Sequence, residues 1–110
     1  MLRIEQDGTV KLTRGDTAKF KVLLKNDDTN EEYIVKTTDK LTLSIKKSTK
    51  DDAPLVQRAV IGSNVINIVP TDTKELPFGK YKYDVELETA ESEIYTVIEA
   101  STFEITEEVT

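Results

Sequence analysis

Apolar and polar side chains alternate along several stretches of this chain, and this period of two constrains the fold more than any other feature. The clearest stretch runs from Gly79 to Glu88, where every second side chain is apolar: Tyr81, Tyr83, Val85 and Leu87. Successive side chains of a β-strand point to opposite faces, so a strand with one buried face gives this pattern. Thr17–Leu24 and Lys40–Lys47 alternate in the same way. Each of these stretches predicts a strand with one wet face.

Composition and turn signals extend this prediction to the whole chain. Val, Ile and Thr number 10, 9 and 15 among 110 residues, and β-branched side chains fit a pleated sheet better than a helix. Weaker strands are predicted at Thr9–Thr13, Glu32–Lys36, Leu55–Val60, Asn64–Val69, Ile94–Ile98 and Thr102–Glu107. Short segments rich in Gly, Asn and Asp separate them, which is typical of an all-β sandwich or barrel. The length predicts one domain, residues 1–110.

Two segments break the alternation. Leu55–Val60 has no clear inward face. Pro70–Pro77 does not alternate at all, and Asp72 followed by Glu75 resembles a capping box. We therefore expect one helical turn in this segment, crossing from one sheet to the other.

The missing residue types restrict the chemistry. The chain has no Cys and no His, which removes disulfides, thiolate zinc ligands, cysteine nucleophiles and the usual general base. No nucleophile, base and orienting group can be assembled from the remaining types. We predict that the protein is not an enzyme and has no catalytic residue, no metal site and no cofactor.

Charge and apolar patterning argue against nucleic-acid and membrane partners, and the charge distribution suggests contact between copies of the chain. The net charge of -6 opposes nucleic-acid binding, and no apolar run approaches the length of a membrane span. Residues 1–50 carry a net +3 and residues 51–110 a net -9. If the basic edge of Lys19, Lys21 and Lys25 lies opposite the acidic strands, copies could join head to tail in a ring. The acidic group comprises Asp84, Glu86, Glu88, Glu104 and Glu107.

Several constellations have a plain structural interpretation. In Arg14–Gly15–Asp16 we expect Gly15 to supply a positive backbone dihedral in a turn, rather than an adhesion motif. Asp84, Glu86 and Glu88 alternate on one strand face, where neighbouring lysines should keep them wet and unsuited to hydrolysis. Loop carboxylates that could approach calcium, but match no calcium loop, are Asp27, Asp28, Asp51, Asp52, Glu91 and Glu93.

A carbohydrate site would need exposed aromatic side chains. Trp is absent, and Tyr81, Tyr83 and Phe103 are predicted to point inward. The remaining aromatic candidates are Tyr33, Phe78 and Tyr95, of which Tyr95 is expected in the core.

The segment Gly79–Tyr83 resembles the start of strand F in immunoglobulin-like domains, where a tyrosine follows a sheet-crossing turn and bonds to nearby backbone. Tyr81 is the matching tyrosine, and Tyr83 stands where antibody domains place their second cysteine. The resemblance implies an immunoglobulin-like antiparallel β-sandwich of about seven to nine strands.

An ordered series of phrases resembles small structural proteins of tailed phages and prophages, in particular the N-terminal immunoglobulin-like domain of baseplate upper proteins. The series is Val10–Thr17, Leu41–Ser48, Leu55–Arg58, Ile66–Pro70, Gly79–Leu87, Tyr95–Ile98 and Thr102–Ile105.

This resemblance implies a non-catalytic virion component that docks to other phage tail or baseplate proteins, with a homo-oligomer as a further possibility. The N-terminal residues have no apolar h-region, so we expect synthesis in the bacterial cytoplasm without a signal peptide. The alternative is a small ligand- or carbohydrate-binding immunoglobulin-like module.

Overall fold

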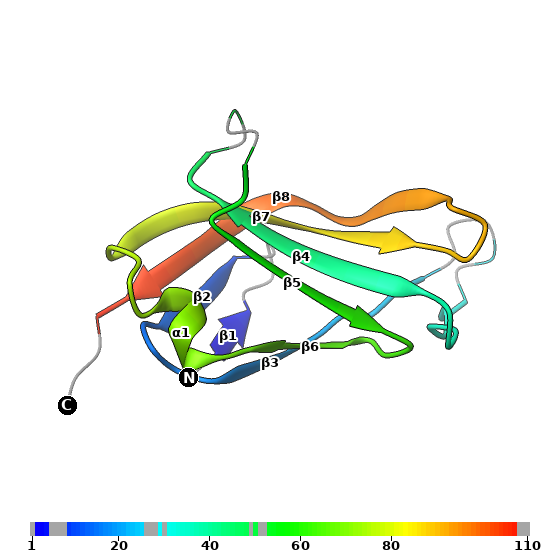
Figure 1. The fold of residues 1–110 in the computed structure, drawn as a ribbon, viewed down its shortest axis with the longest axis horizontal. Helices are drawn as coiled ribbons and strands as arrows, with labels where there is room; N and C mark the ends of the chain where they lie inside the picture. The colour runs from blue at the N-terminus through cyan, green and yellow to red at the C-terminus, as the bar shows by residue number, and fades with distance from the viewer. Residues whose placement is uncertain are drawn as a thin grey trace.

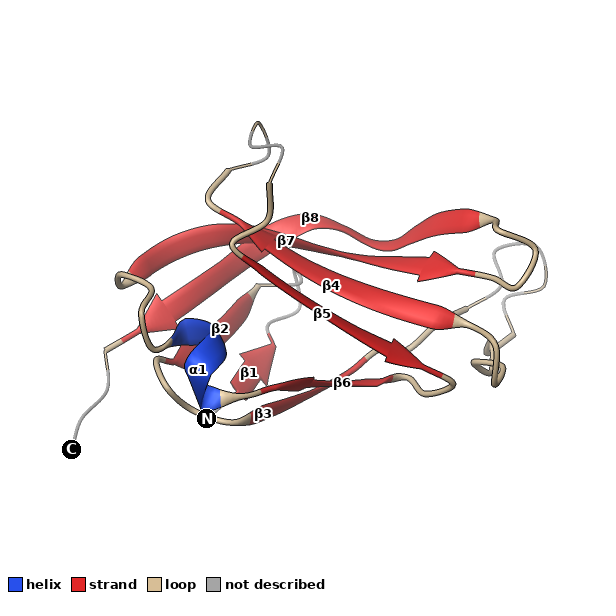
Figure 2. Ribbon diagram, in the orientation of Figure 1, coloured by secondary structure: helices blue, strands red, loops and turns tan. Residues whose placement is uncertain are grey.

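The chain forms two β-sheets and one short helix. The structure, a computed structural model, describes residues 2–4, 9–25, 29, 31–48, 50 and 53–107. The larger sheet has six strands, in the order β1 (Leu2–Ile4), β2 (Val10–Thr13), β8 (Ile94–Thr106), β7 (Gly79–Glu88), β4 (Lys40–Lys46) and β5 (Val56–Ile61). The smaller sheet pairs β3 (Ala18–Lys21) with β6 (Val65–Ile68). The fold is therefore mostly β, as the alternation predicts (Figures 1 and 2).

In Figure 1, β3 and β6 lie beneath β4 and β5, and the larger sheet curls so that its strands β1 and β2 lie near them. Helix α1 (Pro70–Thr73) carries the chain from β6 to β7, and so from the smaller sheet to the larger one. The expected sheet-crossing helical turn is confirmed. Strand β2 pairs with β8 in parallel, and the other strand pairs are antiparallel. Within the described ranges, no helix is long and apolar enough to cross a bilayer.

Strand predictions succeed where the alternation is strong. The bounds of β7 match the prediction, and β4 ends one residue earlier than predicted. The segment Glu32–Lys36 is not a strand, because only Glu32 pairs, in an isolated bridge with Lys25. The two predicted C-terminal strands form the single strand β8, whose pairing with β7 shifts register near Val85. Strand β1 was not predicted.

The inward residues of both sheets form one core. Its largest fully buried members are Phe20, Phe103, Leu12, Leu41, Leu43, Ile45, Ile66, Ile68, Ile105, Val10, Val22 and Val85. An edge-to-face aromatic contact connects the two sheets, because the Tyr83 ring lies 5.8 Å from Phe20 in β3. A second one lies within the larger sheet, with the Tyr83 ring 5.9 Å from Phe103 in β8. The predicted inward orientation of Tyr83 and Phe103 is confirmed.

An ion pair at the sheet edge explains why β5 has no clear inward face. Arg58 lies opposite Leu43, in an inward register position. Its Nε donates to both carboxylate oxygens of Asp72 in α1 at 2.9 Å, while the Asp72 side chain is 7 % exposed. Charge-assisted pairs of this kind are stronger than neutral hydrogen bonds. Arg58 therefore connects β5 to the helix.

Asp72 also caps the helix, but it does so as the third helical residue and not as the N-cap residue that the sequence suggests. Its carboxylate accepts a hydrogen bond from the Val69 backbone N–H at 2.9 Å. The expected box, with Asp72 at the cap and Glu75 three residues later, is wrong because the helix begins at Pro70. Proline at the first helical position has its φ preset for the helix. Asp72 is consequently the acidic residue of the box.

The corner tyrosine makes the predicted bond. The Tyr81 hydroxyl donates to the backbone carbonyl of Pro77 at 2.7 Å, and the ring is buried. This bond fixes the turn between α1 and β7.

The register of β7 can be tested by substitution. Val85 is fully buried and Glu86 is exposed on the opposite face. We expect Val85→Asp to lower the free energy of unfolding by about 4 kcal/mol or more, because it buries an unpaired carboxylate. Glu86→Lys should change it by less than about 0.5 kcal/mol. Urea denaturation followed by circular dichroism measures both, and equal tolerance of the two substitutions would contradict the register.

Candidate functional site

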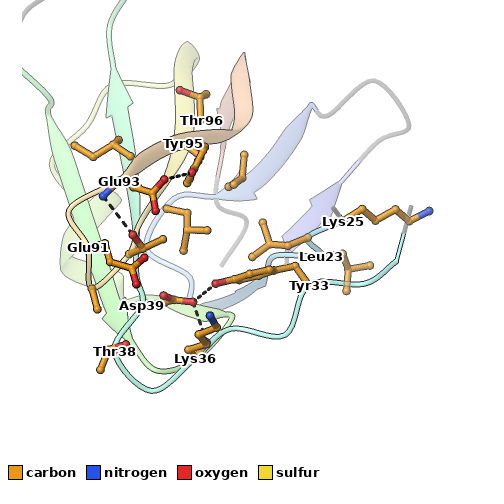
Figure 3. Close-up of a pocket in the computed structure, with 16 residues that line it drawn as sticks. Leu23, Lys25, Tyr33, Lys36, Thr38, Asp39, Glu91, Glu93, Tyr95 and Thr96 are labelled. Carbon is orange, nitrogen blue, oxygen red and sulfur yellow. Dashed lines mark hydrogen bonds between the residues drawn. The ribbon is translucent and has the colours of Figure 1, made fainter. Parts of the chain in front are cut away.

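An open cleft of about 870 Å³ lies at the end of the molecule opposite α1. One wall consists of Leu23–Lys25, which follow β3, together with side chains of the connection to β4. The other wall is the β7–β8 hairpin (Figure 3). The residues that give the cleft its polar character are Tyr33, Lys36, Asp39, Glu91, Glu93 and Tyr95.

Asp39 organises the first wall. It is 1 % exposed, and its carboxylate accepts hydrogen bonds from the Tyr33 hydroxyl at 2.6 Å and from the Lys36 backbone N–H at 2.9 Å. Its backbone carbonyl accepts from the N–H of Gly62 at 2.9 Å. Gly62 has φ +75°, and a Cβ there would lie 3.2 Å from the carbonyl oxygen of Thr37. The wall therefore needs a glycine beside the aspartate.

These bonds determine the protonation states of the pair. Donation from the Tyr33 hydroxyl, followed by the Lys36 N–H, lowers the pKa of Asp39. The same hydrogen bond, with burial and the negative charge of Asp39, raises the pKa of Tyr33 to about 12. Asp39 therefore remains an anion and Tyr33 remains protonated near neutral pH. Neither group is poised to transfer a proton.

The second wall carries a similar pair. The Tyr95 hydroxyl donates to the carboxylate of Glu93 at 2.6 Å, and this bond is the main cause of a raised pKa for Tyr95. Tyr95 is 49 % exposed, so its expected place in the core is wrong. It lies opposite the buried Leu87 in the register, but in a part of β8 that pairs only with β7 among the described strands. Figure 3 shows both tyrosines beside the cleft.

The polar groups of the cleft are partly engaged with one another. Its carboxylates at Asp39 and Glu93 already accept hydrogen bonds from tyrosines. Its charged side chains, Lys25, Lys36, Asp39, Glu91 and Glu93, are of mixed sign. Such a surface provides oriented acceptors, aromatic faces and apolar side chains for recognition.

The other sequence candidates lie elsewhere. Glu86 and Glu88 are exposed and Asp84 is partly exposed on the outer face of β7, so this trio is wet as expected. Glu91 and Glu93 belong to the cleft, whereas Asp27, Asp28, Asp51 and Asp52 lie outside the described residues. Within the described part of the chain, His, Cys, Asp and Glu form no group of three or more that could hold a metal ion.

The Arg14–Gly15–Asp16 turn has the predicted structural role. Gly15 has φ +83°, and its N–H donates to the Thr73 hydroxyl at 2.9 Å. The Arg14 guanidinium lies 4.1 Å from the centre of the Phe78 ring, a favourable cation–π position. Arg14 therefore covers one face of the Phe78 ring, and Phe78 is not among the residues that line the cleft.

The two faces proposed for a head-to-tail contact are only partly separated. Lys19 and Lys21 are exposed on β3 in the smaller sheet, and the acidic residues of β7 and β8 belong to the larger one. Glu104, however, lies between Lys80 of β7 and Lys11 of β2 in the register. The acidic surface is therefore interrupted at that end and concentrated near the cleft.

Comparisons of the chain with protein-family models, with curated proteins and with solved structures found no match.

Sequence reasoning did not identify Asp39 as part of the site. The aspartate sits between turn residues and the strong strand that starts at Lys40, where an acidic residue usually indicates a solvated turn. Its burial depends on Tyr33 and on the N–H of Gly62, which lies in a distant segment. The spacing of Tyr33 and Asp39 alone carries no signal for this contact.

Tyrosine titration tests the geometry of the first wall. Ultraviolet spectra of the wild type should contain a component titrating near pH 12 that disappears in Tyr33→Phe. Because the folded pKa exceeds the ordinary tyrosine value of 10.0, the contribution of Tyr33 to stability is complete below pH 10 and declines as the pH rises toward 12. Asp39→Asn is the matched control, and it should return the pKa of Tyr33 toward 10.0. An unchanged high-pH component in either variant would contradict the pairing.

Proposed function

We propose that the chain is an immunoglobulin-like sandwich. The order β8-β7-β4-β5 matches the G-F-C-C′ order of variable-type immunoglobulin domains, and β3–β6 matches their B–E pair. The Tyr81 bond to Pro77 falls at the start of the strand equivalent to F, where such domains carry a tyrosine corner. In this correspondence, β2 extends the sheet beside the strand equivalent to G.

The proposed activity is non-catalytic recognition of another protein. The observation that carries it is the exposure of apolar side chains that line the cleft: Leu23 is 71 % exposed and Ile94 62 %. The cleft lies between the connections equivalent to the B–C and F–G loops, which form the binding end of variable domains. Exposed apolar groups rimmed by charges favour protein contacts.

We place this recognition in a phage or prophage particle. The support is the ordered series of strands and turns that resembles the N-terminal domain of baseplate upper proteins. The partners are then other tail or baseplate proteins, with copies of the chain itself as a further option, and the location is the virion.

The second candidate is a carbohydrate- or small-ligand-binding module. It is favoured by the cleft itself, where Tyr33 and Tyr95 stand beside the carboxylates of Asp39 and Glu93. Aromatic faces combined with oriented acceptors suit sugar hydroxyls. The wide opening and the apolar rim favour the protein partner.

Particle analysis tests the main proposal. Phage particles induced from the source bacterium and purified on a density gradient should contain this chain in a fixed ratio to the tail proteins. Quantitative mass spectrometry of the gradient fractions provides the measurement, with an abundant cytoplasmic protein as the control. A chain that remains with the cytoplasmic control would contradict a virion role.

A further inference from the structure

Among the strands that the structure describes, β8 has an unpaired edge beside the cleft. Strand β2 pairs only with Phe103–Thr106, and no other described strand lies on that side of β8. The Thr89 N–H donates to the Glu93 carbonyl at 2.9 Å, and two residues further on Leu87 pairs with Tyr95. In an antiparallel ladder the bonded pairs alternate with unbonded ones. The backbone groups of Ile94 and Thr96 therefore point away from β7, toward the free edge.

The cleft extends along the edge of β8 and is not confined to one face of the strand. Its lining includes every residue from Glu93 to Val97, which are residues of both faces of the strand. The opposite wall is lined in the same way by consecutive residues, Leu23, Leu24 and Lys25. Lining by consecutive residues on both sides indicates a slot between two extended segments. One further extended chain can satisfy the backbone groups of such an edge.

The surroundings specify the side chains of that chain. Inward side chains of an added strand would meet Leu24, Tyr95 and Val97, which line the slot. Its outward side chains would lie on the face that carries Glu86 opposite Thr96 and Glu88 opposite Ile94, with Lys40 of β4 on the far side of Glu88. From residue 83 to the last residue, the sequence contains nine Asp or Glu and no Lys or Arg. Side chains of a strand alternate in direction, so apolar and basic residues should alternate in the partner.

We infer that the protein binds an extended segment of a partner protein, of alternating apolar and basic residues, as an added strand on the Ile94–Thr96 edge of β8. This inference rests on the proposed recognition function and identifies the surface and the chemistry of the partner. The apolar side chains would cover the exposed face of Tyr95. The basic side chains would face the carboxylates of the β7–β8 hairpin.

The direct experiment is amide hydrogen exchange on the full chain with the peptide acetyl-(Val-Lys)4-amide as the probe. At saturating peptide we expect the amides of Ile94 and Thr96 to exchange at least about tenfold more slowly, because they gain hydrogen-bond partners. The amides of β5, another strand with a single neighbour, should not change. Protection at β5, or no protection at millimolar peptide, would overturn the inference.

Two control peptides separate the backbone and charge contributions. A version with N-methyl groups on alternate residues keeps the side chains but cannot pair along one edge, so we expect its affinity to fall at least about tenfold. A version with Glu in place of Lys should also bind at least about tenfold more weakly, because like charges then face each other. Equal binding by either control peptide would contradict strand addition or the basic pattern, respectively.

A pair of protein variants tests the acidic face. The double variant Glu86→Gln/Glu88→Gln should weaken binding of the Val-Lys peptide about two- to fivefold at low salt. The matched control, Glu104→Gln/Glu107→Gln, removes two carboxylates at the end of β8 that already pairs with β2 and should leave the affinity unchanged. Equal losses in the two variants would mean that only overall charge attracts the peptide, which would overturn the assigned edge.

Other occupants produce different results. Protection of Ile94 and Thr96 that rises with protein concentration alone would identify a second copy as the occupant. Protection by an oligosaccharide without any effect of the peptide would favour the carbohydrate module. Each result would overturn the inferred partner. If the peptide does not bind but the chain is found in phage particles, the virion role is retained and only the inferred binding edge is wrong.

Discussion

The structure depends on the packing of a small sheet against a large one. An isolated two-stranded sheet is marginal in water, so β3 and β6 are stable only while their inner face is covered. Phe20 supplies the central contact, because its ring meets Tyr83 edge to face and Tyr83 in turn meets Phe103. These rings are at most 2 % exposed. The alternation in β3 and β7 thus reflects the burial that stabilises the fold, since every second side chain belongs to a shared core.

The same packing creates the cleft. The smaller sheet is shorter than the larger one, and its strand β3 ends at Lys21 while β7 and β8 continue. Tyr95 lies in the part of β8 that pairs only with β7 among the described strands, and its side chain is half exposed. Asp39 and Gly62 tie the neighbouring connection to the sheet edge by backbone and side-chain hydrogen bonds. The cleft consequently lies where the two sheets differ in length, beside a buried carboxylate and its tyrosine.

Local sequence patterns predict the strands with the clearest alternation. The features that they do not predict depend on contacts between residues that are distant in the sequence. The alternation of β7 and the position of Tyr81 were visible because each depends on neighbours within a few residues. The sequence places Asp72 at the N-cap, but Pro70 starts the helix earlier. The pairing of Asp72 with Arg58 has no local signal, because Arg58 comes from another strand. Tyr95 was assigned to the core because alternation reports the direction of a side chain but not what lies opposite it. Asp39 was missed for the same reason, because its hydrogen bonds come from the folded connection and from Gly62.

Native-state hydrogen exchange tests the dependence of the small sheet on the large one most directly. The ladder amides of β3 and β6 should open with the same free energy as those of β4 and β7, because neither β3 nor β6 is stable without the shared core. Both sets should also respond equally to low denaturant. Amides of β3 and β6 that open about 2 kcal/mol or more below those of β4 and β7 would contradict a single cooperative core.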